Sequence, residues 1–356
     1  MCSPQYAINS NKQFFIRQDF VEQIPKNIHL ESLSNYKTNH HNGNKFRNEE
    51  GKPFIISKNK IVSAKLWSRY VCAKYDCKNP LSTFNPVKYF DDNNSIRVFW
   101  IGHSTCLIKI ENLFIITDPV FANNAFPPIP FFLKRVTPPP CKIEELPKIS
   151  IILLSHDHYD HMDMDSLKKI KEKNPNVLVF APLRFNELLT PLGFNLIEFD
   201  WRQSLEMNDI RFVCLPARHG SARGIFDQTR RLWCSWLLIK DGIKIYFPGD
   251  SAIGPHFKEI NNTFGDIDLA MMPIGPQEPS DTMKAVHMDP KDAYEMSLDL
   301  GAKKVFPIHY GTFPLGLEPK IDDITLLKNC WKNDTLSVIN VGEFMEWNGN
   351  EFIKNK

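Results

Sequence analysis

The stretch SHDHYDHMD, Ser155 to Asp163, places three histidines and three aspartates within nine positions. It directly follows ISIILL, residues 149–154, an apolar run that predicts a buried strand. Charged groups that leave water without a partner are costly, so a buried strand that ends in His and Asp indicates a site that binds something. The HxHxDH spacing is a specific sign of a metal site.

Other ionisable residues also stand at the ends of predicted strands. His219 ends IRFVCLPARH, Asp250 ends KIYFPGD and His309 ends KVFPIH. Because strand ends on one edge of a sheet converge on one crevice, we expect these side chains to meet the 156–161 stretch. A lone histidine at a strand end is more often a hydrogen-bonded structural residue, and the HxHxDH pattern is what favours the metal interpretation. The predicted metal ligands are His156, His158, Asp160, His161, His219, Asp250 and His309.

Imidazoles and carboxylates around a position left open for water are typical of catalytic zinc. Two such ions can share one carboxylate and activate one water molecule. We therefore expect two zinc ions per chain, with iron and manganese as alternatives that accept the same ligands.

The composition indicates a soluble globular protein, with 42% apolar and 24% charged residues in a chain of 356. The net charge of +2 leaves no electrostatic footprint for nucleic acid. There is no apolar run of about 18 residues and no secretory signal, so we expect no transmembrane segment. The eight scattered cysteines suggest reduced thiols, and we expect the chain in the cytoplasm.

The polar segment 1–95 predicts a partly ordered N-terminal extension that wraps a catalytic domain at 96–356. His40 to Glu50 is expected to be exposed to solvent, and Ile61 to Tyr70 to dock as short helices. Alternating apolar runs over 96–121, with a turn at Glu111-Asn112, predict three strands. Helices are expected at 165–173, 184–190 and 290–301. Strand runs in both halves with helices between them predict the α/β class, as two sheets packed face to face with helices outside.

The motif HDHYDH, followed in order by His219, Asp250 and His309, resembles the metallo-β-lactamase superfamily. The likeness covers most of residues 96–320, and it is strongest to the N-acylphosphatidylethanolamine-hydrolysing phospholipase D family. The further stretches that carry it are WIGHST (100–105), ITDPVF (116–121), RVTPPP (135–140), FDQTRRLWCSW (226–236), FPGDS (247–251), MMPIGPQEP (271–279), MKAVHMDP (283–290) and PIHYGTF (307–313). The resemblance implies an αββα sandwich of two mixed β-sheets flanked by helices.

The resemblance also implies roles for single residues. His156, His158 and His219 would hold one zinc ion, and Asp160, His161 and His309 the other. Asp250 would bridge the two ions. Tyr159 and His287 would contact the substrate near its phosphate, and His287 would donate a hydrogen bond or a proton there. The alternative for His287 is a structural contact that caps the helix beginning at Asp289-Pro290. The expected catalytic residues are Asp160, Asp250 and His287. Apart from the resemblance, we expect His103 and Asp118 to orient ligands or to brace turns, and His256, which has no motif around it, to be structural.

The activity implied is zinc-dependent hydrolysis of N-acylphosphatidylethanolamine to an N-acylethanolamine and phosphatidic acid. Because the substrate is a phospholipid, we expect the protein to associate peripherally with a membrane. Phe126 to Arg135 (FPPIPFFLKR) offers aromatic and basic residues for this contact, although these phenylalanines are nearly as well explained as core residues.

Two other functions remain open on the sequence. WIGHST is also similar to the sugar-phosphate lactonase branch of the superfamily, whose members act on small soluble substrates. A non-catalytic binding protein of the same fold is a further alternative, but such proteins typically lose ligands and all seven are present here. A homodimer is an assembly that the sequence leaves open.

Overall fold

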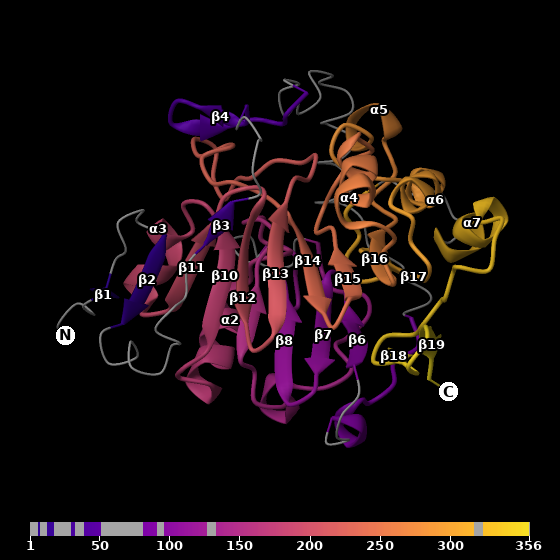
Figure 1. The fold of residues 1–356 in the computed structure, drawn as a ribbon, viewed down its shortest axis with the longest axis horizontal. Coiled ribbons are helices and arrows are strands. Elements are labelled where there is room, and N and C mark those ends of the chain that lie inside the picture. The colour runs from indigo at the N-terminus through magenta and orange to yellow at the C-terminus, as the bar shows by residue number, and fades with distance from the viewer. Residues whose placement is uncertain are drawn as a thin grey trace.

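The computed structural model describes residues 6–7, 13–17, 30–32, 39–50, 81–90, 96–126, 133–316 and 323–355. In these ranges, ten strands form the larger of two main sheets, in which antiparallel and parallel pairs are mixed (Figure 1). Their spatial order is β1 (Tyr6–Ala7), β2 (Phe14–Arg17), β11 (Asn195–Phe199), β10 (Leu178–Pro182), β9 (Ile151–Leu153), β8 (Leu113–Thr117), β7 (Thr105–Ile110), β6 (Ile96–Gly102), β18 (Phe344–Trp347) and β19 (Phe352–Lys354).

The second sheet is also mixed and contains seven of the described strands. Their order is β17 (Val305–Ile308), β16 (Leu269–Pro273), β15 (Ile243–Phe247), β14 (Ser235–Lys240), β13 (Ile210–Leu215), β12 (Gln203–Met207) and β3 (Glu31–Ser32). A separate hairpin joins β4 (His41–Asn42) to β5 (Lys45–Phe46).

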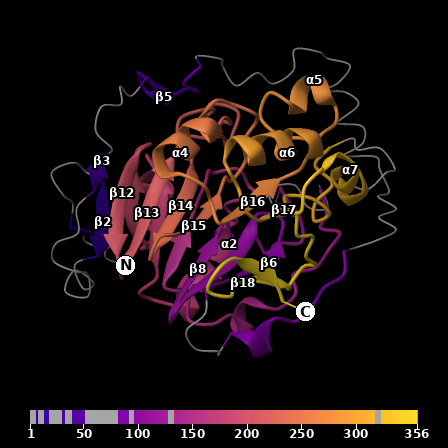
Figure 2. The same ribbon diagram turned by 45° about the vertical axis from the view of Figure 1, so that its right-hand side comes forward.

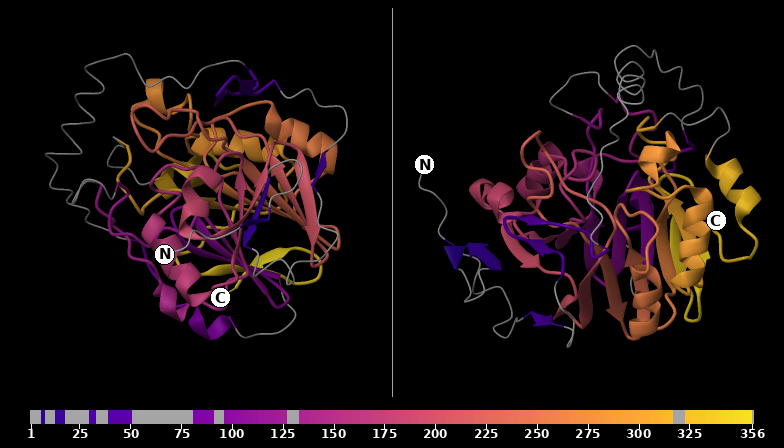
Figure 3. Two further views of the ribbon diagram at one scale, coloured as in Figure 1. Left: turned by 90° about the vertical axis from the view of Figure 1, so that its left-hand side faces the viewer. Right: turned by 90° about the horizontal axis from the view of Figure 1, so that it is seen from above.

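The two sheets pack face to face, and helices cover their outer faces (Figures 2 and 3). Neighbouring residues of one strand face different cores, because side chains alternate across a sheet. Ile151 packs in the core that also contains Phe212 and Trp236 of the second sheet, whereas Ile152 packs with Leu167 of helix α2. The described helices are α2 (Met164–Lys173), α3 (Asn186–Leu189), α4 (His256–Phe264), α5 (Ser280–Met283), α6 (Pro290–Asp299) and α7 (Asp323–Cys330). The predicted αββα sandwich is confirmed.

Local signals account for most element boundaries. The turn between β7 and β8 has Glu111 at a φ of 54°, as the predicted hairpin requires. Asp163 caps α2 by accepting the amide hydrogen of Asp165, and Asp289 caps α6, whose first residue is a proline. The helix predicted at 184–190 is shorter, because Pro191 has no amide hydrogen and the chain continues as a 3-10 turn.

The described parts of the N-terminal segment are built into the sandwich. β2 pairs with β11 in one sheet, and β3 pairs with β12 in the other. The expectation of solvent exposure for residues 40–50 is wrong for His40, Phe46 and Asn48, which are buried. The helices expected over 61–70 lie outside the described residues, and the division of the chain at residue 95 stays a prediction. None of the described helices is long and apolar enough to cross a lipid bilayer.

Candidate metal centre

One cluster of imidazoles forms where the loop after β9 meets the loop after β13. His156 and His158 come from the first loop and His219 from the second. The Nδ1 atom of His158 lies 3.1 Å from Nε2 of His219. One nitrogen from each of the three rings lies within 4.8 Å of the other two. The structure thus brings together the three residues predicted for the first ion.

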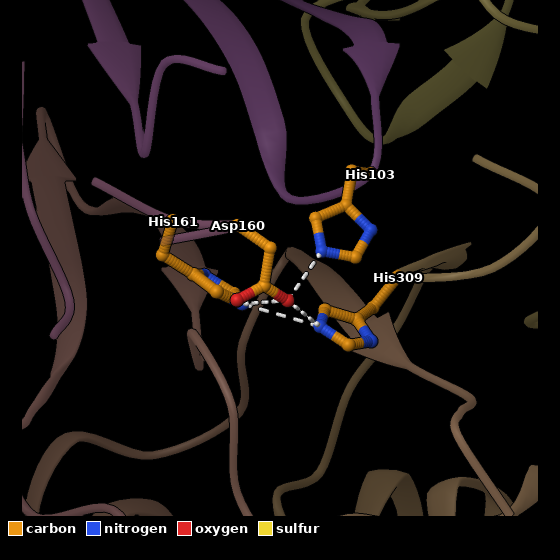
Figure 4. Close-up of side chains that lie close together, drawn as sticks. All are labelled: His103, Asp160, His161 and His309. Carbon is orange, nitrogen blue, oxygen red and sulfur yellow. Dashed lines mark hydrogen bonds and ion pairs between the residues drawn. The ribbon is translucent and has the colours of Figure 1, made fainter. Parts of the chain in front are cut away.

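A second cluster lies beside the first and includes Asp160, His161 and His309, with His103 as a fourth member. Figure 4 shows the Asp160 carboxylate between three imidazoles. Its Oδ2 atom lies 3.2 Å from Nε2 of His103 and 3.7 Å from Nε2 of both His161 and His309. The Nε2 atoms of His161 and His309 are 3.1 Å apart. The three residues predicted for the second ion therefore also meet.

Asp250, which follows β15, lies between the two clusters. Its Oδ2 atom is 3.1 Å from Nε2 of His161, and its Oδ1 atom is 3.1 Å from Nε2 of His309. Towards the other cluster, Oδ2 lies 3.8 Å from His156 and 3.7 Å from His219. A carboxylate that contacts both sets of imidazoles has the position expected of a bridging ligand.

The donors fit divalent cations. Two zinc ligands in a tetrahedral site, each about 2.0–2.1 Å from the ion, lie about 3.3 Å apart, close to the two nitrogen–nitrogen contacts of 3.1 Å. Within the described part of the chain, Nε2 of His156 is buried without a hydrogen-bond partner. A buried nitrogen lone pair that no donor satisfies is available to bind a metal ion.

Hydrogen bonds from other residues fix the orientation of the rings. Nδ1 of His161 lies 2.7 Å from Oδ2 of Asp118, which also accepts the Ser155 hydroxyl at 2.5 Å. Nδ1 of His219 lies 2.8 Å from the main-chain oxygen of Val286. Such contacts select which ring nitrogen is free to bind an ion. The predicted orienting role of Asp118 agrees with its contact to His161.

Comparison with known proteins agrees with this geometry. Residues 114–310, more than half of the chain, match the β-lactamase superfamily domain. The chain is 34% identical over 275 residues to N-acyl-phosphatidylethanolamine-hydrolyzing phospholipase D 1 of Caenorhabditis elegans, a match that covers 72% of this chain and 77% of the relative. The chain belongs to this phospholipase D family of the metallo-β-lactamase superfamily.

The chain is also similar to a yeast relative and to solved structures. The chain is 35% identical over 237 residues to the mitochondrial N-acyl-phosphatidylethanolamine-hydrolyzing phospholipase D of Saccharomyces cerevisiae. That match covers 62% of this chain and 49% of the relative, so the chain spans about half of the yeast protein. Among solved structures, the metallo hydrolase Igni18 of Ignicoccus hospitalis has a TM-score of 0.55 at 20% identity, covering 71% of this chain and 98% of Igni18. This likeness concerns the metallo-β-lactamase fold.

Burial and the neighbouring carboxylates set the pKa values of the side chains in this candidate metal centre. Burial lowers the pKa of His219 to about 3, more than Asp250 raises it. Burial also disfavours the charged form of His309, but Asp250 and Asp160 outweigh this effect and raise its pKa to about 9. Burial acts to raise the pKa of Asp250, yet His161 and His309 hold it well below its ordinary value. The carboxylate is therefore ionised, as a ligand of a cation must be.

Asn48 of the N-terminal segment contacts this centre, which the sequence analysis missed. Its Oδ1 atom accepts the amide hydrogen of His219 at 3.1 Å, and its Nδ2 atom donates to the His219 carbonyl at 3.0 Å. The indole of Trp233 also donates to Oδ1 of Asn48. No sequence signal links positions 48 and 219, because they are far apart in the chain and Asn48 has no motif around it.

The two sheets approach each other closely at the ligand loops. Gly249, directly before Asp250, has a φ of 59°, and a Cβ atom at this position would lie 2.5 Å from Cβ of Ser155. The amide of Cys234 also donates to the carbonyl of Ser155. Position 249 therefore requires glycine both for its backbone conformation and for this contact.

The predicted substrate residues lie at the edge of the centre. Tyr159 lines an apolar cavity of about 550 Å³ that also includes His158, Asp160 and Arg223. His287 lies beside Asp250, with its Nδ1 atom 3.6 Å from Oδ2 of that residue. It does not cap α6, because Asp289 does. The remaining predicted structural residue, His256, is buried and lies 3.1 Å from the Ser251 hydroxyl.

The loop predicted to meet a membrane is only partly described, because residues 127–132 lie outside the described ranges. The side chain of Arg135, which is expected to meet lipid phosphates, is half-buried. Its guanidinium donates to the carbonyls of Val120 and Ala122, both at 2.7 Å, and lies 4.5 Å from the centre of the Phe313 ring. Leu133 is buried, whereas Lys134 is exposed.

Proposed function

We propose that the chain is a metal-dependent phosphodiesterase that hydrolyses N-acylphosphatidylethanolamine to an N-acylethanolamine and phosphatidic acid. The observation that carries this proposal is the position of Asp250 between two imidazole clusters that adjoin an apolar cavity. The worm and yeast relatives carry this activity in their names. A centre suited to cations beside an apolar cavity fits a substrate with a phosphate and acyl chains.

Two divalent metal ions would be held by the two clusters, with Asp250 in contact with both. His156, His158 and His219 would bind one ion, and Asp160, His161 and His309 the other. When bound, the ions would neutralise the phosphodiester, make a water molecule more acidic and stabilise the departing oxygen. Zinc suits this set of ligands, and iron and manganese remain alternatives.

His287 would position the phosphate. Burial lowers its pKa well below the ordinary value, an effect that Asp250 only partly opposes. The ring is therefore neutral near pH 7 and carries one N–H group, which suits it to donate a hydrogen bond to a phosphate oxygen. Tyr159 would form one wall of the substrate cavity, where its hydroxyl donates to the Arg223 carbonyl at 3.0 Å.

A turn beside the cavity would make the contact with a lipid bilayer. Ile225 is 82% exposed and Phe226 is 94% exposed, and Ile225 also lines the cavity. Asp227 holds this turn by accepting the amide hydrogen of Gly224 at 2.7 Å and by pairing with Arg231. Large apolar side chains that are exposed to water beside a cavity favour the insertion of this turn into a membrane interface.

Product analysis tests the proposed reaction. The purified protein is incubated with N-acylphosphatidylethanolamine vesicles, and products are identified by mass spectrometry beside the Asp250→Asn variant. We expect N-acylethanolamine and phosphatidic acid from the wild-type protein and a loss of both in the variant. Release of fatty acid and phosphatidylethanolamine would overturn the reaction assigned here. Hydrolysis of a soluble lactone without any vesicle activity would favour the lactonase alternative.

A further inference from the structure

Arg223 is held rigidly against the loop that carries the predicted ligands. Its Nη1 atom donates to the main-chain carbonyls of Asp157, at 2.9 Å, and Met162, at 2.8 Å. Its guanidinium carbon lies 4.0 Å from the centre of the Tyr159 ring. Main-chain acceptors and an aromatic face fix the direction of this side chain without neutralising its charge.

The nearby carboxylates are committed to other groups. Asp157 pairs with Arg231, and Asp227 pairs with Arg231 and accepts the amide hydrogens of Arg223 and Gly224. Among the described residues, no carboxylate forms an ion pair with the guanidinium of Arg223. Both N–H groups of Nη1 have protein acceptors, whereas Nε and Nη2 have none in the described part of the chain.

Arg223 is one of the residues that border the cavity proposed for the substrate. Arg223 lines the cavity together with His158, Tyr159 and Asp160, and therefore lies beside both clusters. The rest of the lining is largely apolar and includes Ala125, Phe126, Leu133, Ile225 and Leu315. A fixed cation with free donors, next to apolar walls, matches a ligand that has an anionic head and a hydrocarbon tail.

We propose that Arg223 is the anion-binding residue of this cavity and takes the charged phosphate oxygens of an acyl-chain substrate through Nε and Nη2. This assignment rests on the proposed function for the identity of the substrate, but not for the binding of an anionic amphiphile. Because a guanidinium binds two oxygens at once, lysine is a poor replacement. Arg223 would thereby favour phospholipids over uncharged lipids of the same chain length.

The test measures binding of octyl phosphate and of uncharged octyl glucoside by titration calorimetry. Arg223→Gln removes hydrogen bonds to a charged group, so we expect the affinity for octyl phosphate to fall about 10- to 100-fold. The affinity for octyl glucoside should not change. Arg223→Lys should recover only part of the loss. The matched control is Arg230→Gln, because Arg230 is on the same turn but is exposed and pairs with Glu187.

Metal content and circular dichroism establish that each variant is folded. If Arg223→Gln does not fold, Arg223→Lys decides, since it keeps the charge but loses the planar donors. Wild-type affinity for octyl phosphate in a folded Arg223→Gln or Arg223→Lys protein would overturn the proposal. An equal loss of octyl glucoside binding would also overturn it, because the effect would then be one of cavity shape.

Kinetics on N-acylphosphatidylethanolamine vesicles separate this inference from the proposed function. We expect Arg223→Gln to raise KM by a larger factor than it lowers kcat. If the wild-type protein hydrolyses no N-acylphosphatidylethanolamine, the proposed function fails, and the calorimetric comparison still decides the role of Arg223.

Discussion

Asn48 pairs with the main chain of His219 through two reciprocal hydrogen bonds, of 3.1 Å and 3.0 Å. The side-chain amide of Asn48 makes the two hydrogen bonds that a neighbouring strand would otherwise make with the main chain of His219. It thereby fixes the position of a predicted metal ligand. Because Asn48 is 4% exposed, water does not substitute for it. The N-terminal segment is thus part of the support of the centre.

Replacement of Asn48 by Asp should weaken this support. Aspartate offers only acceptors, so the His219 carbonyl would lose its donor, at a cost of about 1–3 kcal/mol. We expect a lower unfolding temperature and a lower metal content after dialysis. Asn44→Asp is the matched control, because Asn44 lies in the same hairpin segment with an exposed side chain. Metal retention and stability equal to those of the wild-type protein would show that Asn48 has no such role.

Replacement of Asp118 by Asn should loosen the orientation of His161. The contact between Oδ2 of Asp118 and Nδ1 of His161 is 2.7 Å, and substitutions of such partners typically cost about 10- to 100-fold in metal affinity. Competition with a chromophoric chelator measures this loss. The exposed Asp165→Asn serves as control, and equal affinities in both variants would contradict the role assigned to Asp118.

Removal of metal should both inactivate and destabilise the protein. Five of the seven predicted ligands are buried, among them the ionised Asp250, and an ion that binds these side chains only in the folded protein stabilises the folded state. We expect a chelator to lower the unfolding temperature and abolish vesicle hydrolysis. Added zinc, iron or manganese should then restore both, and the ion that restores most identifies the preferred metal. An unfolding temperature insensitive to chelation would argue against a metal centre.

The anchor of the N-terminal hairpin should depend on pH. Asp200 Oδ1 lies 2.6 Å from Nε2 of His40, and its Oδ2 lies 2.8 Å from Nε2 of His41. Burial acts to raise the pKa of Asp200, but these two contacts outweigh it and lower the pKa. A depressed pKa contributes stability that is present above the unfolded-state value of about 3.9 and is lost as the pH falls through the folded-state value.

We therefore expect Asp200→Asn to be less stable than the wild-type protein at pH 7, with a difference that shrinks below about pH 4. Urea unfolding at pH 7, 5 and 3.5 measures it. The carboxylate also accepts the amide hydrogen of Trp201, and the main-chain amide of Asp200 donates to the side chain of Gln203; neither of these groups titrates. A difference that is constant with pH would contradict this account.

The exposed turn should govern membrane binding. Ile225→Ser together with Phe226→Ser removes apolar area worth about 1.5–3 kcal/mol per side chain if both insert. We expect at least about a tenfold loss of sedimentation with phospholipid vesicles. Leu298→Ser is the control, since Leu298 is a 52% exposed apolar residue on α6. If both variants bind vesicles as the wild-type protein does, the turn is not the membrane contact.

The elements that local sequence patterns encode were predicted well. The strands over 96–117, the capped helices α2 and α6, and the convergence of His156, His219, Asp250 and His309 follow from alternation, capping and strand-end position. The errors concern contacts between distant segments. His40 is buried against Asp200, and Asn48 is buried against the main chain of His219. A polar segment is expected to be exposed when only its own sequence is considered. The partners that bury such residues come from distant parts of the chain, and only the tertiary fold brings them together.

Gly249 affects the distances between the predicted metal ligands, although it is not a ligand itself. The absence of a side chain at Gly249 lets the loop that carries Asp250 lie against Ser155, next to His156, so the spacing of the donors depends on a residue that is not itself a predicted ligand. An engineer who wishes to widen the cluster for a larger ion would gain little by exchanging the donors themselves. Alanine at position 249 would push the loops apart, and it would also strain a backbone whose φ is 59°.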